Sequence, residues 1–103
     1  LRANGLEAQS IRLIGGGSKS PVWRQIVADI MDTTVICTEQ TEAAALGAAI
    51  QAAWCHSGSQ QSLADLCERC VKLDPASETR PITEQVAASQ KAYANYQERI
   101  ATL

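Results

Sequence analysis

Three consecutive glycines, Gly15, Gly16 and Gly17, separate a short apolar run from a predicted helix. Glycine lets the backbone approach a ligand closely, and the first N–H groups of a helix are unpaired donors at the positive end of its dipole. This arrangement suits a phosphate-bearing ligand. A tight turn needs fewer than three glycines, so the sequence favours contact with a nucleotide over a plain turn.

Two common nucleotide motifs fit the glycine loop poorly. A P-loop needs Gly directly before Lys, whereas Ser18 precedes Lys19 here. A dinucleotide fingerprint is closer, because Gly15, Gly17 and Ser20 have nearly its spacing and Glu39 lies roughly 20 residues further on, where a ribose-binding acid belongs. Pro21 argues against that fold, since the helix is already under way at this point of a dinucleotide site. A dinucleotide-binding fragment remains the least favoured alternative.

The cysteines could hold a metal, but their positions favour packing. Cys67 and Cys70 have metal-like spacing, and Cys55 with His56 could complete four ligands. The pair nevertheless falls within a helical apolar pattern, where free cysteine behaves as a small hydrophobe. We therefore predict no metal ligands. Cys37 lies in a predicted buried strand, and reduced cysteines of a cytoplasmic protein are the better interpretation.

The elements that position the loop follow from residue patterns. We expect strands at 11–14 and 33–38, and a helix that begins at Pro21 with Ser20 as its N-cap. A helix from Glu42 to about Trp54 has almost no polar face and is expected to be buried. Later elements are an amphipathic helix at 60–71, a loop at 74–81 and a final helix capped by Thr83. The expected core includes the stripe on the Pro21 helix, formed by Val22, Trp23, Ile26, Val27, Ile30 and Met31.

Composition narrows the classes of function. The chain has 103 residues, a formal net charge of -2 and no run of basic residues, which excludes a nucleic-acid or anionic-lipid surface. The longest apolar stretch, 43–50, is far below the ~20 residues that cross a bilayer. The chain starts at Leu1 and contains only two predicted short strands, which are too few for a stable sheet. We therefore expect a cytoplasmic fragment of a longer chain.

Two segments together carry a resemblance to a known family. One runs from Ile11 through the glycines to Gln25, followed by Ala28 and Asp29; the other is Glu42-Ala-Ala-Ala-Leu-Gly-Ala-Ala49. In combination they resemble the C-terminal part of the FGGY carbohydrate kinases, and within that family they are most similar to the xylulose kinases. The resemblance implies an α/β fold, namely the C-terminal part of an actin-like, ribonuclease-H-like ATPase domain spanning residues 1–103.

The resemblance also implies what the chain does and what it lacks. ATP would be the phosphate donor, with Mg²⁺, and the backbone of Gly15, Gly16 and Gly17 would lie against the nucleotide. Ser18 and Ser20 would offer hydroxyls near the adenine and ribose. The catalytic base, the sugar site and most of the Mg²⁺ site would belong to the remainder of the kinase chain, so no catalytic residue is expected here.

Several residues have plainer interpretations, and one alternative function stays open. Asp29 is expected to cap a helix or lie on the surface rather than act as an acid, and Glu42 to favour its own helix N-terminus. Gly47 costs a helix roughly 1 kcal/mol, which suggests either close approach of a backbone or of the nucleotide, or tight packing against the Pro21 helix. The alternative function is a non-catalytic helical interaction module in which the glycines only form a turn. A homodimer is compatible with either function.

Overall fold

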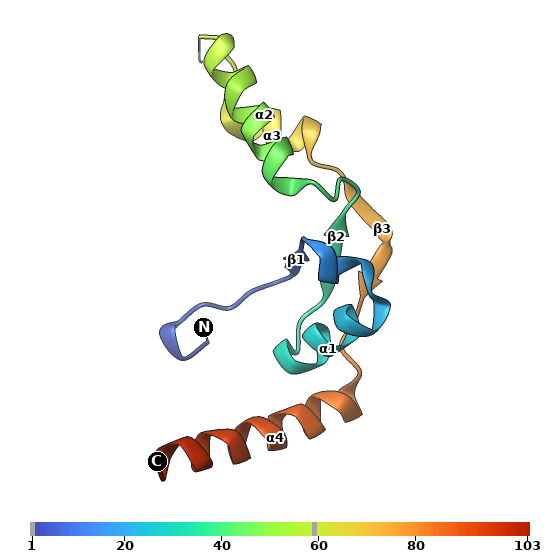
Figure 1. Cartoon of the computed structure of the whole chain (residues 1–103), viewed down its shortest axis with the longest axis vertical. Coiled ribbons are helices and arrows are strands. Elements are labelled where there is room, and N and C mark those ends of the chain that lie inside the picture. The colour runs from blue at the N-terminus through green and yellow to red at the C-terminus, as the bar shows by residue number, and fades with distance from the viewer. Residues whose placement is uncertain (1, 59) are drawn as a thin grey trace.

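The computed structural model describes residues 2–58 and 60–103 and shows a three-stranded sheet with four α-helices (Figure 1). Two short 3-10 helices, at Arg2–Asn4 and Gly16–Lys19, complete the described elements. The bounds are β1 Ile11–Leu13, α1 Pro21–Met31, β2 Val35–Thr38, α2 Ala43–His56, α3 Leu63–Cys70, β3 Leu73–Thr79 and α4 Thr83–Ala101. The expected α/β architecture is confirmed.

The sheet has the strand order β1-β2-β3. β1 and β2 run parallel, with Ile11 opposite Val35 and Leu13 opposite Cys37. Parallel neighbours need a crossover connection, and α1 supplies it. Val35 and Cys37 are buried on the face that α1 covers, so the glycine loop is fixed between a strand end and a helix start.

The segment predicted to be a loop at 74–81 is instead mostly strand β3, which pairs antiparallel with β2. The prediction was wrong because Pro75 indicates a break, whereas an edge strand with an irregular register tolerates proline. The register shifts between Val35 and Cys37, and the buried Ser77 hydroxyl accepts a hydrogen bond from the Cys37 N–H at 2.8 Å. A side chain thus replaces a backbone acceptor of the ladder.

Helix α1 is packed through the opposite face from the one predicted. Its fully buried residue is Ala28, and Asp29 is buried beside it. The apolar stripe is largely exposed: Val22 is 69% exposed, Ile30 58% and Trp23 49%. The expectation that this stripe forms core is therefore wrong for the described chain. Within the described chain, α1 packs against β2, β3 and α4, and Ala28 and Asp29 are the residues of α1 that this packing buries.

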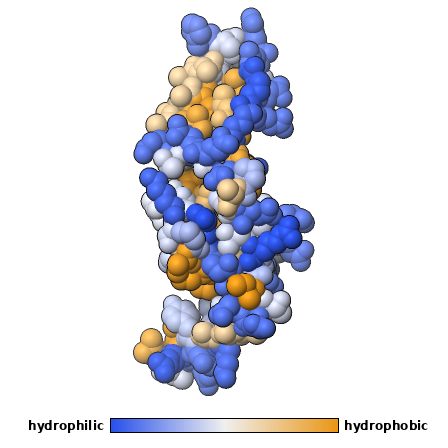
Figure 2. All heavy atoms as spheres, turned by 90° about the vertical axis from the view of Figure 1, so that its right-hand side faces the viewer, coloured by the Kyte–Doolittle hydropathy of each residue, from blue (hydrophilic) through white to orange (hydrophobic). Residues whose placement is uncertain are grey.

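Helix α2 also departs from expectation, because Ile50 is its only buried residue in the described chain. It pairs with the shorter α3, and the two project from the sheet (Figure 1). Figure 2 shows apolar residues gathered on the surface of this projecting part. The chain measures 54 × 30 × 21 Å with a radius of gyration of 17.6 Å, whereas a compact domain of this length has about 13 Å. The described chain is therefore elongated, with little core.

The last helix, α4, is held at its start by α1. Thr83 is its first residue, and no side chain of its own caps it, so the predicted Thr83 cap is wrong. Instead, the Asp29 carboxylate accepts a hydrogen bond from the Ile82 N–H at 2.8 Å, together with one from Gln25 Nε2 at 2.9 Å. Beyond the buried Val86, the helix extends away from the body (Figure 1). No helix of the described residues has the length and apolar character of a membrane span.

Candidate functional site

The glycine loop leaves the carboxyl end of β1 and turns sharply at Gly15. Gly15 has φ 88° and ψ -176°, a conformation that residues with a side chain rarely adopt. Gly16–Lys19 then form one 3-10 turn, and Ser20 leads into α1. The positive φ explains why the first of the three positions is glycine.

Two carbonyl groups of the loop accept hydrogen bonds from side chains. The Gly15 carbonyl accepts from the Ser18 hydroxyl at 2.7 Å and from the Ser18 N–H at 3.1 Å. The Ser18 carbonyl accepts from Arg24 Nη1 at 2.8 Å and from the Cys37 thiol at 3.6 Å. The loop is therefore braced against α1 and β2.

The outer side of the loop is open. In the described part of the chain, the N–H groups of Gly16 and Gly17 have no hydrogen-bond partner. A Cβ added to Gly16 would meet no atom within 4 Å, whereas one on Gly17 would come within 3.0 Å of the Trp23 ring. Gly17 is therefore needed for packing, and Gly16 marks the free face that presents backbone donors outward.

The serines predicted to contact the nucleotide have structural roles here. The buried Ser18 donates its hydroxyl to Gly15, as described above. Ser20 is the N-cap of α1, as predicted, and its hydroxyl accepts from the Trp23 N–H at 3.2 Å. Pro21 is the first helical residue, also as predicted. Both hydroxyls shape the loop, and a direct contact of either with nucleotide stays a prediction.

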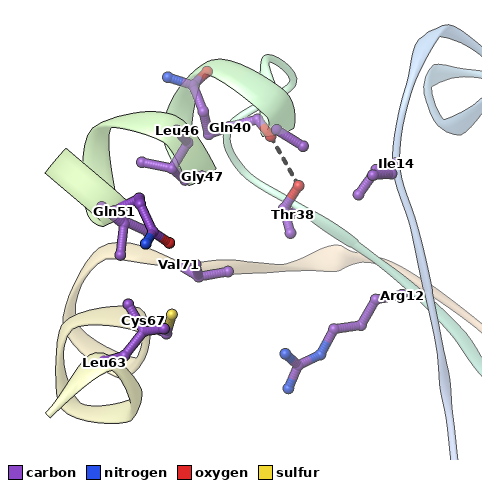
Figure 3. A pocket seen from close by; sticks show the side chains of 12 residues that line it. Arg12, Ile14, Thr38, Gln40, Leu46, Gly47, Gln51, Leu63, Cys67 and Val71 are labelled. Atoms are coloured by element: carbon purple, nitrogen blue, oxygen red, sulfur yellow. Dashed lines mark hydrogen bonds between the residues drawn. The ribbon is translucent and has the colours of Figure 1, made fainter. Parts of the chain in front are cut away.

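A cleft of about 340 Å³ opens between the sheet and the α2–α3 pair. Figure 3 shows Arg12 and Thr38 on the strand side, with Leu46, Gln51 and Cys67 on the helix side. Gly47 also lines this cleft, and a Cβ there would meet nothing within 4 Å of the described residues. The close approach expected at Gly47 is therefore not made within the described chain. The cleft is almost entirely apolar apart from Arg12, Thr38 and two glutamines.

The acidic and thiol groups do not converge on a metal. Among residues 2–58 and 60–103, no three His, Cys, Asp or Glu side chains lie together as a metal would need. Asp29 caps α4 and is buried, which matches the expected capping role and excludes a surface one. Glu42 stands at the N-cap position of α2, and His56 ends that helix. The described residues therefore do not fit a Mg²⁺ site by themselves.

The comparison with known families decides where the chain belongs. The sequence pattern of the FGGY family of carbohydrate kinases, C-terminal domain, matches residues 1–56, more than half of the chain. The chain belongs to this family. The match covers every element from the glycine loop through α2, which are the elements that carry the predicted resemblance.

Curated relatives of this FGGY domain include xylulose and autoinducer-2 kinases. The xylulose kinase of Haemophilus influenzae is 47% identical over 95 residues, which are 92% of this chain and 19% of that protein. The autoinducer-2 kinase of Salmonella paratyphi B is 40% identical over 94 residues, 91% of this chain and 17% of that protein. The chain thus spans less than a fifth of the length of the curated relatives it matches.

A solved structure shares the fold. The ligand-bound xylulose kinase from Lactobacillus acidophilus matches with a TM-score of 0.78 and 24% identity, over 95% of this chain and 19% of that one. At this identity the likeness concerns the fold. The shared fold extends over nearly the whole chain.

Sequence reasoning missed the residues that brace the FGGY loop from behind. Arg24 reads as an ordinary polar residue on the far side of α1, and Cys37 as a plain core residue. Their bonds to the Ser18 carbonyl join positions 6 and 19 residues apart. A contact of that kind has no local sequence signal, although an Arg on the turn after an N-cap is well placed to reach back to the preceding loop.

Proposed function

We propose that this chain is the C-terminal, nucleotide-binding segment of an ATP-dependent sugar kinase, and that residues 1–103 form one unit of its ATP-binding lobe. The 47% identity with a xylulose kinase over 92% of the chain carries the proposal. The reaction would transfer the γ-phosphate of ATP to a hydroxyl of D-xylulose, giving ADP and xylulose 5-phosphate. A cytoplasmic location remains part of this proposal.

The glycine loop would supply the nucleotide contact. Phosphoryl transfer depends mainly on positioning and on stabilisation of charge. The N–H groups of Gly16 and Gly17 have no partner among residues 2–58 and 60–103, and the space at Gly16 is open; both features suit an acceptor-rich ligand lying against the backbone. We keep Gly15, Gly16, Gly17, Ser18 and Ser20 as the proposed loop site, with the two serines shaping the loop and the glycines facing the nucleotide.

The remainder of the kinase chain would supply the chemistry. Mg²⁺, which neutralises charge on the phosphates of ATP, would be held by residues outside this segment, as would the sugar and the catalytic base. The same remainder would cover the exposed apolar faces. Val22 and Ile30 on α1, and most of α2, are exposed in the described chain. Removing this apolar surface from water would be favourable.

A substitution at Gly16 in the full-length kinase tests the nucleotide role. Gly16→Val should raise the KM for ATP about 10-fold or more, roughly 1.4 kcal/mol, because the side chain would project into the free face. The KM for the sugar and the melting temperature should hardly change, since Gly16 has space for a side chain. Ala94→Val, on the exposed surface of α4, is the matched control. An unchanged ATP KM in a folded Gly16→Val enzyme would remove the loop from the nucleotide site.

The sugar is tested separately with substrates. The purified full-length kinase should phosphorylate D-xylulose with a higher kcat/KM than autoinducer-2, in line with the higher identity to the xylulose kinase. A preference for autoinducer-2 would assign the protein to the second group of relatives. That outcome would leave the nucleotide role of the loop intact.

A further inference from the structure

The glycine loop contains a carbonyl whose direction is fixed by a charged side chain. The Ser18 carbonyl accepts from Arg24 Nη1 at 2.8 Å and from the weaker Cys37 thiol donor at 3.6 Å. A hydrogen bond from a guanidinium is charge-assisted and stronger than one between neutral groups. Arg24 is therefore the main group that holds this carbonyl toward the protein.

Arg24 is committed to this inward position. It lies at the end of the first turn of α1 and is half-buried. Its Nε is buried and has no hydrogen-bond partner among the described residues. Leaving one guanidinium donor unpaired in the interior costs free energy. The hydrogen bond from Arg24 to the Ser18 carbonyl is what Arg24 gains from this buried position.

The direction of the carbonyl matters for an anionic ligand. A carbonyl oxygen carries partial negative charge and would repel phosphate or the lone pairs of a nucleoside if it faced outward. Gly15 and Ser18 both have their carbonyls bonded inward, while the N–H groups of Gly16 and Gly17 remain unpaired in the described chain. The Gly15, Gly17 and Ser18 carbonyls are therefore bonded within the protein, whereas the Gly16 and Gly17 N–H groups have no partner among the described residues.

We propose that Arg24 is a positioning residue of the nucleotide site, which acts by fixing the Ser18 carbonyl inward so that the loop presents the Gly16 and Gly17 N–H groups to ATP. The inference rests on the proposed nucleotide role of the loop. Arg24 does not touch the nucleotide; its effect passes through the peptide groups of Gly15–Lys19. Ser18, which is 7% exposed, is the residue that connects Arg24 to the glycine loop.

The test uses the full-length kinase with three substitutions. Arg24→Met keeps the length and the apolar stem but removes the donor, and should raise the KM for ATP about 10-fold, equivalent to roughly 1.4 kcal/mol, with the sugar KM unchanged. Arg24→Lys keeps the charge and one donor, and should show a smaller rise. Arg99→Met removes the same charge from the exposed surface of α4 and should leave both KM values unchanged.

Each result has a distinct meaning when read beside Gly16→Val. If Gly16→Val raises the ATP KM and Arg24→Met does not, the positioning role is wrong and the nucleotide role stands. If neither variant changes the ATP KM, the positioning role of Arg24 and the nucleotide role of the loop are both wrong. If Arg24→Lys behaves as wild type and the Arg24→Met effect disappears at high salt, Arg24 acts by long-range charge, and the positioning role is wrong. Should Arg24→Met lower the melting temperature too far to assay, the Arg24→Lys value decides: a rise in ATP KM alone supports positioning, and equal rises in both KM values refute it.

Discussion

Removal of the Asp29 carboxylate should loosen α4 at its start. Asp29 is buried, and Oδ1 accepts from the Ile82 N–H at 2.8 Å and from Gln25 Nε2 at 2.9 Å. Hydrogen bonds to a charged group contribute about 1.5–3 kcal/mol each. Since the two share one oxygen and Gln25 keeps its bond to the Arg80 carbonyl, we expect Asp29→Ala to cost about 3 kcal/mol in total. Asp29→Asn keeps an acceptor oxygen and should cost about 1 kcal/mol.

Hydrogen exchange of the full-length kinase measures this loss where it occurs. A multi-domain protein has no single two-state unfolding energy, whereas amide exchange reports local opening. A loss of about 3 kcal/mol corresponds to roughly 100-fold faster exchange for amides in the first turns of α4. Asp32→Asn is the matched control, because Asp32 is exposed and its φ of 47° is tolerated by Asn. Equal exchange in α4 for Asp29→Ala and Asp32→Asn would refute the capping role.

Three further outcomes are expected. Gly15→Ala should destabilise the full-length kinase by about 1–3 kcal/mol because of the positive φ, whereas Gly16→Ala should cost under 1 kcal/mol; equal melting temperatures would contradict the loop geometry. Ser20→Ala should cost about 1 kcal/mol, measured by thermal unfolding, through loss of the N-cap of α1; no change would mean that Pro21 alone sets the helix start. Elemental analysis should find no stoichiometric zinc, and one zinc per chain, lost on Cys67→Ser, would overturn the packing role of that cysteine.

Local sequence patterns predicted the strands and helices around the glycine loop, but not which other elements pack against each helix or strand. β1, α1, β2 and α2 follow from apolar periodicity, the Ser20-Pro21 start and the glycines, and all four are present. β3 was missed because its irregular pairing places Pro75 at an edge and uses the Ser77 hydroxyl as a ladder acceptor. Neither feature produces the alternation of apolar and polar residues from which a strand is predicted.

The prediction of burial failed for a different reason. Periodicity identifies the apolar side of α1, and composition the apolar character of α2, but neither shows whether the covering surface lies within the same segment. In the described chain Ala28 and Asp29 are buried while Val22 is 69% exposed. The candidate loop could be found from sequence because glycines and the helix start are local. The brace from Arg24 to Ser18 could not, because it depends on the direction of a loop carbonyl.

The connection between α1 and α4 has a mechanical consequence. The glycine loop lies at one end of α1, and Asp29, near the other end, holds the start of α4. A helix of 19 residues is about 28 Å long at about 1.5 Å per residue. If α4 turns with α1 as a rigid lever, a tilt of about 10° displaces its far end by about 5 Å, given that length. The exposed side chains of Tyr96, Ile100 and Leu103 lie at that far end, so a small rotation beside the loop would become a larger displacement at the C-terminal end of α4.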